Sequence, residues 1–320
     1  MTTATAPAPV HRSFTRAHLR TLLMVLVLGL AVHVLLPQVG ELRHSVRAVE
    51  HANWVWLALG LVATVATFLS AAVALTGAAG RPLPFVPTVL AQLASSFANR
   101  LAPGSLGGLG VNERYLQRAG LDGPQAGAAL ALNGVAGVLV HVTALIVAGL
   151  AVGRGGVGEI HLPRGWGLLV VVTVALAALG IGLGAPFARR RLLPPLKEAA
   201  TSLADVARRP RQALVLFGGA IGITSAYALA FGLSLHAFHA HASAAKVAAV
   251  YLGGAVVSAA SPTPGGLGAM EAALVAGLTG VGVAEGPAVT SVLGFRLLTY
   301  WLPILPGYLA LRHLRQRQLL

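Results

Sequence analysis

The sequence has no cysteine and few charged residues. The lack of cysteine excludes disulfides, thiolate metal sites and cysteine nucleophiles. Charged residues make up 10% of the 320 positions, whereas soluble domains have about 25%. Only nine residues are acidic, and the sequence contains no DxD motif and no aspartate cluster for magnesium. We therefore expect no catalytic residues and no cofactor, and the sequence favours a function other than catalysis.

Hydrophobic residues are abundant instead, at 56% of the chain, and the mean hydropathy is +0.78. This composition predicts a membrane protein that crosses the bilayer several times. The net charge of +14 would suggest nucleic-acid binding in a soluble protein. Here the basic residues cluster between apolar runs, which is how membrane proteins are oriented, so we expect no nucleic-acid partner.

Six apolar runs are long enough to cross a bilayer, which requires about 20 helical residues. They are residues 21–39, 54–76, 124–152, 165–187, 213–236 and 286–311. Two further apolar stretches, about 87–119 and 244–281, are interrupted by glycines. Their limbs are mostly too short to span, so we expect each stretch to form a helical hairpin.

The distribution of Lys and Arg predicts the orientation of the chain. Basic residues precede the first run, crowd residues 189–211 and follow the sixth run, and Arg81 follows the second. These loops are expected in the cytoplasm, with both termini, in a multi-pass protein of the cell (plasma) membrane. The hairpin at 87–119 must then enter from the cytoplasmic face and the hairpin at 244–281 from the external face.

The two hairpins carry the same motif. GGLGVNE spans residues 107–113 and GGLGAME spans residues 265–271. Three predicted crossings separate the motifs, so the two halves would be inverted copies, an architecture typical of secondary transporters. The predicted fold is therefore an all-α polytopic membrane protein with six full spans plus two re-entrant helical hairpins arranged as inverted repeats.

The predicted organisation has four parts. A cytoplasmic tail, 1–20, precedes the first membrane repeat, 21–152. The second membrane repeat, 153–312, is followed by a second cytoplasmic tail, 313–320.

The glycines of the motif predict an anion site. Glycine permits sharp turns, and a helix that starts after such a turn presents free amides and a positive dipole end. On this interpretation Gly107, Gly108, Gly265 and Gly266 line a cavity that binds substrate. The same glycines also fit a second interpretation, in which they only allow helices to pack closely.

Charged residues near the motifs are the other candidates. Glu113 and Glu271 occupy the same place in both copies. A carboxylate at membrane depth is costly, so each glutamate is expected to form an ion pair, bond to first-turn amides, or exchange protons during transport. Arg100, Arg114 and Arg296 are the basic partners available to bind a phosphate. The repeat aligns Arg296 with Asn133, so the two halves differ there.

The histidines are weaker candidates. His236, His239 and His241 could hold a metal, but histidines at the end of a span are commonly interfacial, and we predict no metal site. His141 lies inside an apolar run, where a hydrogen-bonded packing role is favoured over a proton relay.

The stretches PGGLGAMEAALVAGLTGVGV and FRLLTYWLPILPG resemble the second half of the lysylphosphatidylglycerol synthase membrane-domain (flippase-domain) family. LAPGSLGGLGVNERYLQRAGL is similar to the family's first-half motif. The resemblance covers about residues 20–312 and implies movement of a lipid phosphate headgroup between leaflets, with Glu271, Arg296, Gly265 and Gly266 at matching positions. It also implies a stand-alone member that lacks the aminoacyl-transferring domain of the full synthases.

The predicted function is thus a flippase-like translocator of an anionic phospholipid or a polyprenyl-phosphate-linked headgroup. Two other functions fit the same residues: an integral-membrane enzyme acting on lipid phosphates, and a non-transporting partner of a lipid-dependent glycosyltransferase. The expected partners are the membrane and its anionic lipid, with a second copy of the chain or a lipid-modifying enzyme as further candidates.

Overall fold

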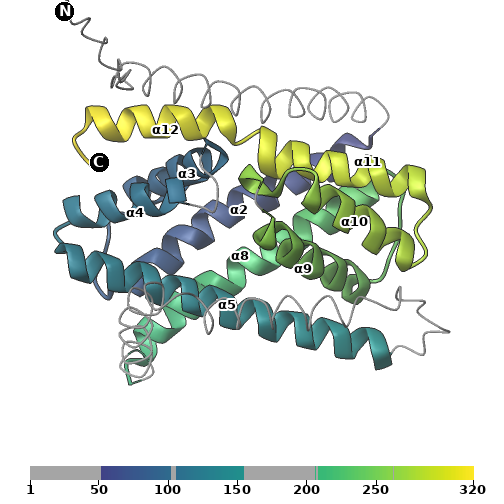
Figure 1. Cartoon of the computed structure of the whole chain (residues 1–320), viewed down its shortest axis with the longest axis horizontal. Coiled ribbons are helices and arrows are strands. Elements are labelled where there is room, and N and C mark those ends of the chain that lie inside the picture. The colour runs from purple at the N-terminus through teal and green to yellow at the C-terminus, as the bar shows by residue number, and fades with distance from the viewer. Residues whose placement is uncertain (1–51, 102–105, 155–205, 207, 262) are drawn as a thin grey trace, which may run out of the picture. The chain divides into compact units, whose positions relative to one another are not determined.

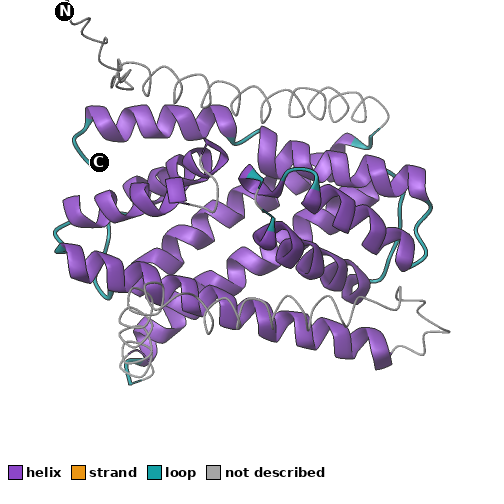
Figure 2. Cartoon of the chain, in the orientation of Figure 1, coloured by secondary structure: helices purple, strands orange, loops and turns teal. Residues whose placement is uncertain are grey.

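The computed structural model describes residues 52–101, 106–154, 206, 208–261 and 263–320 (Figure 1). The predicted spans 21–39 and 165–187 and the predicted N-terminal tail lie outside these residues. The described residues form helices joined by short loops and contain no β-strand (Figure 2). The all-α prediction is therefore confirmed for this part of the chain.

Four helical segments are long and apolar enough to cross a membrane. They are α2 (Trp54–Ala79), α5 (Gly123–Arg154), α8 (Pro210–Ala237) and the continuous run Glu285–Gln316. The four predicted runs in this part of the chain are thus confirmed as long apolar helices. Large apolar side chains such as Val62, Val138 and Leu214 are exposed on them, as expected of surfaces that face lipid.

Two pairs of shorter helices occupy the interrupted stretches. The first pair is α3 (Phe85–Leu101) and α4 (Leu106–Arg118), and the second is α9 (Ala244–Ala260) and α10 (Ala269–Gly280). The two helices of each pair pack against each other. The stretches 87–119 and 244–281 are therefore helical pairs whose limbs are shorter than a membrane span.

The run Glu285–Gln316 is broken near its middle. It begins as α11 (Glu285–Arg296), continues as a π-helical turn (Leu297–Trp301) and ends as α12 (Ile304–Gln316). Pro303 and Pro306 lie at the start of α12. A proline inside a helix removes a backbone donor and disturbs the preceding turn, which accounts for the break.

The helices of the two halves pair in the same way (Figure 1). The helix α5 of the first half packs on α9 of the second half, and α12 of the second half packs on α3 of the first. Each half thus places its last long helix against the short-helix pair of the other half.

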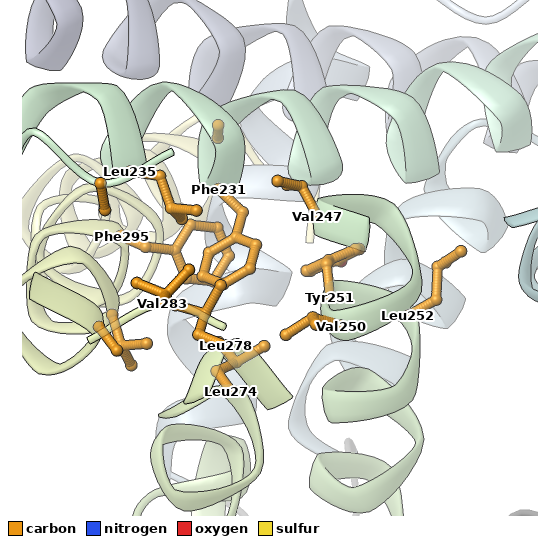
Figure 3. Close-up of a cluster of buried hydrophobic side chains, with 14 of the residues drawn as sticks. Phe231, Leu235, Val247, Val250, Tyr251, Leu252, Leu274, Leu278, Val283 and Phe295 are labelled. Atoms are coloured by element: carbon orange, nitrogen blue, oxygen red, sulfur yellow. The ribbon is translucent and has the colours of Figure 1, made fainter. Parts of the chain in front are cut away.

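The pair α2 and α8 is the most extensive helix contact in the described chain. Glycines permit its close approach: a Cβ at Gly77 would collide with the backbone of Leu216, and a Cβ at Gly219 with the backbone of Ala74. Small residues at crossings are how membrane helices gain packing contacts. A buried apolar cluster lies beside this pair and joins α8, α9, α10 and α11 through Phe231, Leu274 and Phe295 (Figure 3).

Candidate functional site

A polar cavity of about 350 Å³ lies among α3, α8, α9, α11 and the turn that joins α9 to α10. Its lining combines two arginines with hydroxyl groups, an amide and aromatic rings. The arginines are Arg100 and Arg296, and the other polar or aromatic lining residues are Ser96, Asn99, Tyr227, Tyr251, Ser258, Ser261, Thr263, Phe295, Thr299 and Tyr300. Tyr251 and Phe295 also belong to the buried apolar cluster of Figure 3, so that cluster forms one wall of the cavity.

Arg296 closes the last turn of α11 and is held by the second short-helix pair. Its guanidinium forms an ion pair with Glu271 in the first turn of α10. It also donates from Nη2 to the carbonyl oxygen of Gly265 (3.4 Å). The two side chains of the ion pair are only 7% and 14% exposed, so each charge compensates the other in a poorly solvated place. Of the predicted alternatives for Glu271, the structure contains the ion pair.

Arg100 reaches the same cavity from α3. Its Nη1 donates to the carbonyl and hydroxyl oxygens of Ser96, at 2.6 Å each. Its Nη2 donates to the carbonyl oxygen of Thr299 (3.1 Å), so this side chain links the first short-helix pair to the broken helix. Its Nε is buried without a hydrogen-bond partner among the described residues.

The ring of Tyr300 lies close to both guanidinium groups. The Cζ atom of Arg296 is 4.2 Å from the ring centroid, and that of Arg100 is 4.8 Å away. Cation–π attraction within about 6 Å favours this arrangement. Arginines from two different halves of the sequence therefore converge beside a single aromatic ring.

The carbonyl of Thr299 is available to Arg100 because of a proline. In an α-helix this carbonyl would accept from the N–H of residue 303, but Pro303 has no N–H. The backbone instead forms a π-helical turn, in which Leu302 N donates to the carbonyl oxygen of Leu297 (2.9 Å). π-helical turns occur frequently at functional sites, and this one carries Tyr300.

The turn at Gly265 and Gly266 is one that only glycine adopts without strain. Both residues have positive φ angles, 62° and 66°. A Cβ on Gly265 would collide with the ring of Tyr300, and a Cβ on Gly266 with the side chain of Ser258. The second motif is therefore a tight turn that lines the cavity, and the helix α10 begins at Ala269 directly after it, as predicted.

The prediction of a turn at the first motif is wrong, because α4 already begins at Leu106 and contains Gly107, Gly108 and Gly110. A Cβ on Gly107 would collide with the carbonyl oxygen of Ala98 in α3. The N–H of Gly108 donates to Asn99 Oδ1 (2.6 Å). These two glycines let α3 and α4 pack closely, which is the second interpretation of the motif. Neither lines the cavity.

Glu113 and Arg114 also lie apart from the cavity. Both side chains are exposed on α4. The carboxylate of Glu113 accepts a hydrogen bond from Gln117 Nε2 (3.4 Å) and forms no ion pair with any described residue. Of the nine candidate residues, the structure thus brings together Arg100, Gly265, Gly266, Glu271 and Arg296.

The histidines have local roles in the described structure. The Nε2 of His141 is 3.1 Å from the carbonyl oxygen of Leu252, a hydrogen bond between α5 and α9. The rings of His236 and His241 are 5.3 Å apart. Within the described ranges, no group of three or more metal-ligating side chains comes together.

Several cavity residues escaped sequence analysis, above all Ser96, Thr299 and Tyr300. For Thr299 and Tyr300 a signal was present in the two prolines of WLPILPG, which indicate a break in a long apolar run and hence free carbonyls one turn earlier. No signal in the sequence points to Ser96. The prolines identify the helix that is broken, but they do not identify the side chain that donates to its free carbonyl. Arg100 lies almost two hundred positions away, and only the fold brings it to Thr299.

The arrangement is suited to an anion. The guanidinium-bearing residues Arg100 and Arg296 line the cavity, and none of the described carboxylates does. The carboxylate of Glu271 forms an ion pair with Arg296. Guanidinium forks, hydroxyls and backbone amides are the groups that bind phosphate oxygens in proteins. The cavity can therefore hold a phosphate-bearing group with a single net negative charge.

Comparison with known proteins identifies a family. Residues 10–307 match the model of the family described as lysylphosphatidylglycerol synthase TM region. The match covers most of the chain and includes every cavity residue. No curated protein matches the sequence.

Proposed function

Because the chain belongs to the lysylphosphatidylglycerol synthase TM-region family, we propose that this multi-pass membrane protein moves a lipid headgroup between the two leaflets of the cell membrane. The transported lipid is an anionic phospholipid or a polyprenyl-phosphate-linked headgroup. Its phosphate occupies the polar cavity while its hydrocarbon chains stay in the bilayer.

The observation that carries this proposal is the convergence of Arg100 and Arg296 beside Tyr300 in a cavity of about 350 Å³. Charged side chains within membrane segments are costly and mark substrate or ion pathways. Here they come from two halves whose helices pair in the same way. Substrate sites of transporters with internal repeats lie at such an interface between the repeats.

In the proposed transport mechanism, each half of the chain contributes part of the phosphate site. Arg100 belongs to the first half, whereas Arg296, Glu271 and the turn at Gly265 belong to the second. A phosphate bound between the two guanidiniums contacts both halves at once. When one half rocks against the other, the cavity opens toward the opposite leaflet while the headgroup stays shielded from the hydrocarbon.

The proposed topology has six full spans and two re-entrant hairpins in inverted orientation, with both termini in the cytoplasm. The four long apolar helices and the two short-helix pairs support it. In this arrangement the short helices end inside the membrane. Their ends supply the polar groups of the cavity without a complete crossing.

The test is lipid movement in proteoliposomes that contain a fluorescent anionic phospholipid. Wild-type protein is expected to expose inner-leaflet lipid to an impermeant quencher. Arg100→Gln and Arg296→Gln should each slow this by at least about tenfold, because each removes charge-assisted hydrogen bonds worth about 1.5 kcal/mol or more.

The matched control is Arg114→Gln, which also removes one arginine but lies on an exposed face away from the cavity. It should transport at the wild-type rate. Unchanged transport in both cavity variants, with all proteins folded, would exclude the proposed route.

A further inference from the structure

A second cavity, of about 400 Å³, shares no lining residue with the first. It lies where the end of α2, the start of α5 and the start of α8 meet. Its polar lining consists of two arginines, Arg81 and Arg209, and two amides, Gln125 and Gln212. The proposed function makes no use of this cavity.

The polar side chains around this cavity are partly fixed by the backbone. Arg81 donates from Nη1 to the carbonyl oxygen of Gly120 (3.2 Å), in the turn before α5. Gln212 donates from Nε2 to the carbonyl oxygen of Gly77 in α2 (3.0 Å). The guanidinium of Arg209, directly before α8, is exposed and makes no hydrogen bond or ion pair with a described residue.

None of the carboxylates that the structure describes lines the cavity, whereas two arginines do. Asp122 adjoins the lining residue Leu121 in the sequence. Its Oδ1 accepts a hydrogen bond from the backbone N–H of Gln125 (2.7 Å). This carboxylate therefore caps the first turn of α5 and does not pair with Arg81 or Arg209.

Part of the cavity lining is apolar. Leu121, Leu132 and Val206 line it, and the last two belong to a buried cluster with Leu216. The cavity thus combines a basic side with an apolar side, whereas a site for a free anion would need no apolar wall. A phospholipid has the same two parts, a phosphate and the beginning of its acyl chains.

We propose that this cavity binds the phosphate group of an anionic phospholipid of the cytoplasmic leaflet, as an accessory lipid that is not transported. Arg81 and Arg209 bind the phosphate, and the glycerol and first acyl carbons lie against Leu132. Basic pockets between membrane helices on the cytoplasmic side are typical sites for anionic headgroups. The charge distribution of the sequence places both arginines on that side.

The size of the cavity agrees with this ligand, because sites for small molecules commonly measure about 300 to 1,000 Å³. This proposal does not depend on the transport function. A lipid bound here would tie together α2, α5 and α8, and it would be retained even if the first cavity transported nothing.

The experiment uses the absence of cysteine to place one thiol in the cavity. Ala128→Cys puts the thiol on the lining, and Ala131→Cys puts it on the same helix outside the lining. The rate of maleimide labelling of purified protein in detergent is measured with dioctanoyl phosphatidylglycerol, with dioctanoyl phosphatidylcholine, and with inorganic phosphate. We expect the phosphatidylglycerol alone to slow labelling, and only at Ala128→Cys.

Variants of the two arginines complete the test. Arg81→Gln with Arg209→Gln should weaken the protection of Ala128→Cys by about tenfold or more, since each arginine contributes charge-assisted hydrogen bonds. The matched control, Arg118→Gln with Arg211→Gln, removes two exposed arginines that do not line the cavity and should leave protection unchanged. If the double variant fails to fold, Arg209→Gln alone should still weaken protection, because its side chain supports no other described contact.

Three results would overturn the proposal. Equal protection by phosphatidylcholine would mean a purely apolar site. Equal protection by inorganic phosphate would mean a site for the free anion. Protection that persists without both arginines would mean that they do not bind the ligand.

Discussion

At the scale of single residues, Glu113 and Glu271 occupy matching positions in the two motifs but lie in different surroundings. Glu271 is mostly shielded, with 14% of its side chain exposed, and is paired with Arg296, whereas Glu113 is exposed and accepts a hydrogen bond from Gln117. The cause is the partner that each carboxylate meets. The repeat aligns Arg296 with Asn133, so the first half has no arginine at the corresponding place.

We predict that Glu271→Gln lowers the free energy of unfolding by about 3 kcal/mol, because it removes the carboxylate that pairs with the poorly solvated Arg296 guanidinium. Glu113→Gln should change it little, since exposed side chains seldom matter for stability. Denaturant unfolding of both variants in detergent micelles measures the difference.

A further variant separates the ion pair from other effects of the substitution. Adding Arg296→Gln to Glu271→Gln removes the guanidinium that paired with Glu271 and should restore part of the lost stability. Equal effects of Glu271→Gln and Glu113→Gln would contradict the role of burial described here.

At the scale of elements, the broken helix from Glu285 to Gln316 links the two halves. Pro303 leaves the carbonyl of Thr299 without its usual donor, and Arg100 of α3 fills that place. The long helix was predictable from its apolar residues, and its break from its prolines. The partner of the free carbonyl was not, because a contact between positions 100 and 299 depends on how the helices pack.

We predict that Pro303→Ala and Arg100→Gln have coupled effects on stability. When Pro303 is present, Arg100→Gln leaves the Thr299 carbonyl without its Arg100 donor. This should lower the free energy of unfolding by about 1 kcal/mol or more. In the Pro303→Ala variant, residue 303 has a backbone N–H that can donate to the Thr299 carbonyl. Adding Arg100→Gln to this variant should therefore lower the free energy of unfolding by less.

A double-mutant cycle on the free energy of unfolding measures this coupling. Thr76→Ala is a suitable control partner for Pro303→Ala, because the Thr76 hydroxyl donates within α2, to the carbonyl oxygen of Ala72, and to no other described residue. Strictly additive effects of Arg100→Gln and Pro303→Ala would show that the proline does not free the carbonyl for Arg100.

The conformation of the two glycine motifs could not be predicted from their sequence alone. Both copies read GGLG, yet the first is helical and the second is a turn with positive φ at Gly265, Gly266 and Gly268. Only the second copy directly follows a proline, Pro264. The glycines themselves permit both conformations, and their neighbours and packing partners decide between them.

At the scale of the whole molecule, the order and pairing of the helices repeat. The helix α5 packs on the second short-helix pair as α12 packs on the first. The hydropathy pattern predicted four of the long helices and both short pairs, because apolar length is a local property. It could not predict that each half packs its last helix on the other half, since that arrangement depends on contacts far apart in the sequence.

Inverted halves predict opposite exposure of two matching positions. Gly123 and Gly286 lie at the starts of α5 and α11. In intact cells an impermeant maleimide should label Gly286→Cys but not Gly123→Cys, and permeabilised cells should show labelling of both. Equal labelling of the two sites in intact cells would contradict the inverted topology.

We propose that a lipid headgroup crosses the membrane through the cavity between Arg100 and Arg296. The most direct test places a single thiol in the cavity at Ala259→Cys, with Ala276→Cys on the exposed surface of α10 as control. Transport of a fluorescent anionic lipid is measured in proteoliposomes before and after a bulky thiol reagent is attached. The attached group should stop transport by the Ala259→Cys variant and leave transport by the Ala276→Cys variant unchanged. Transport that continues at the same rate through a blocked cavity would contradict the proposal.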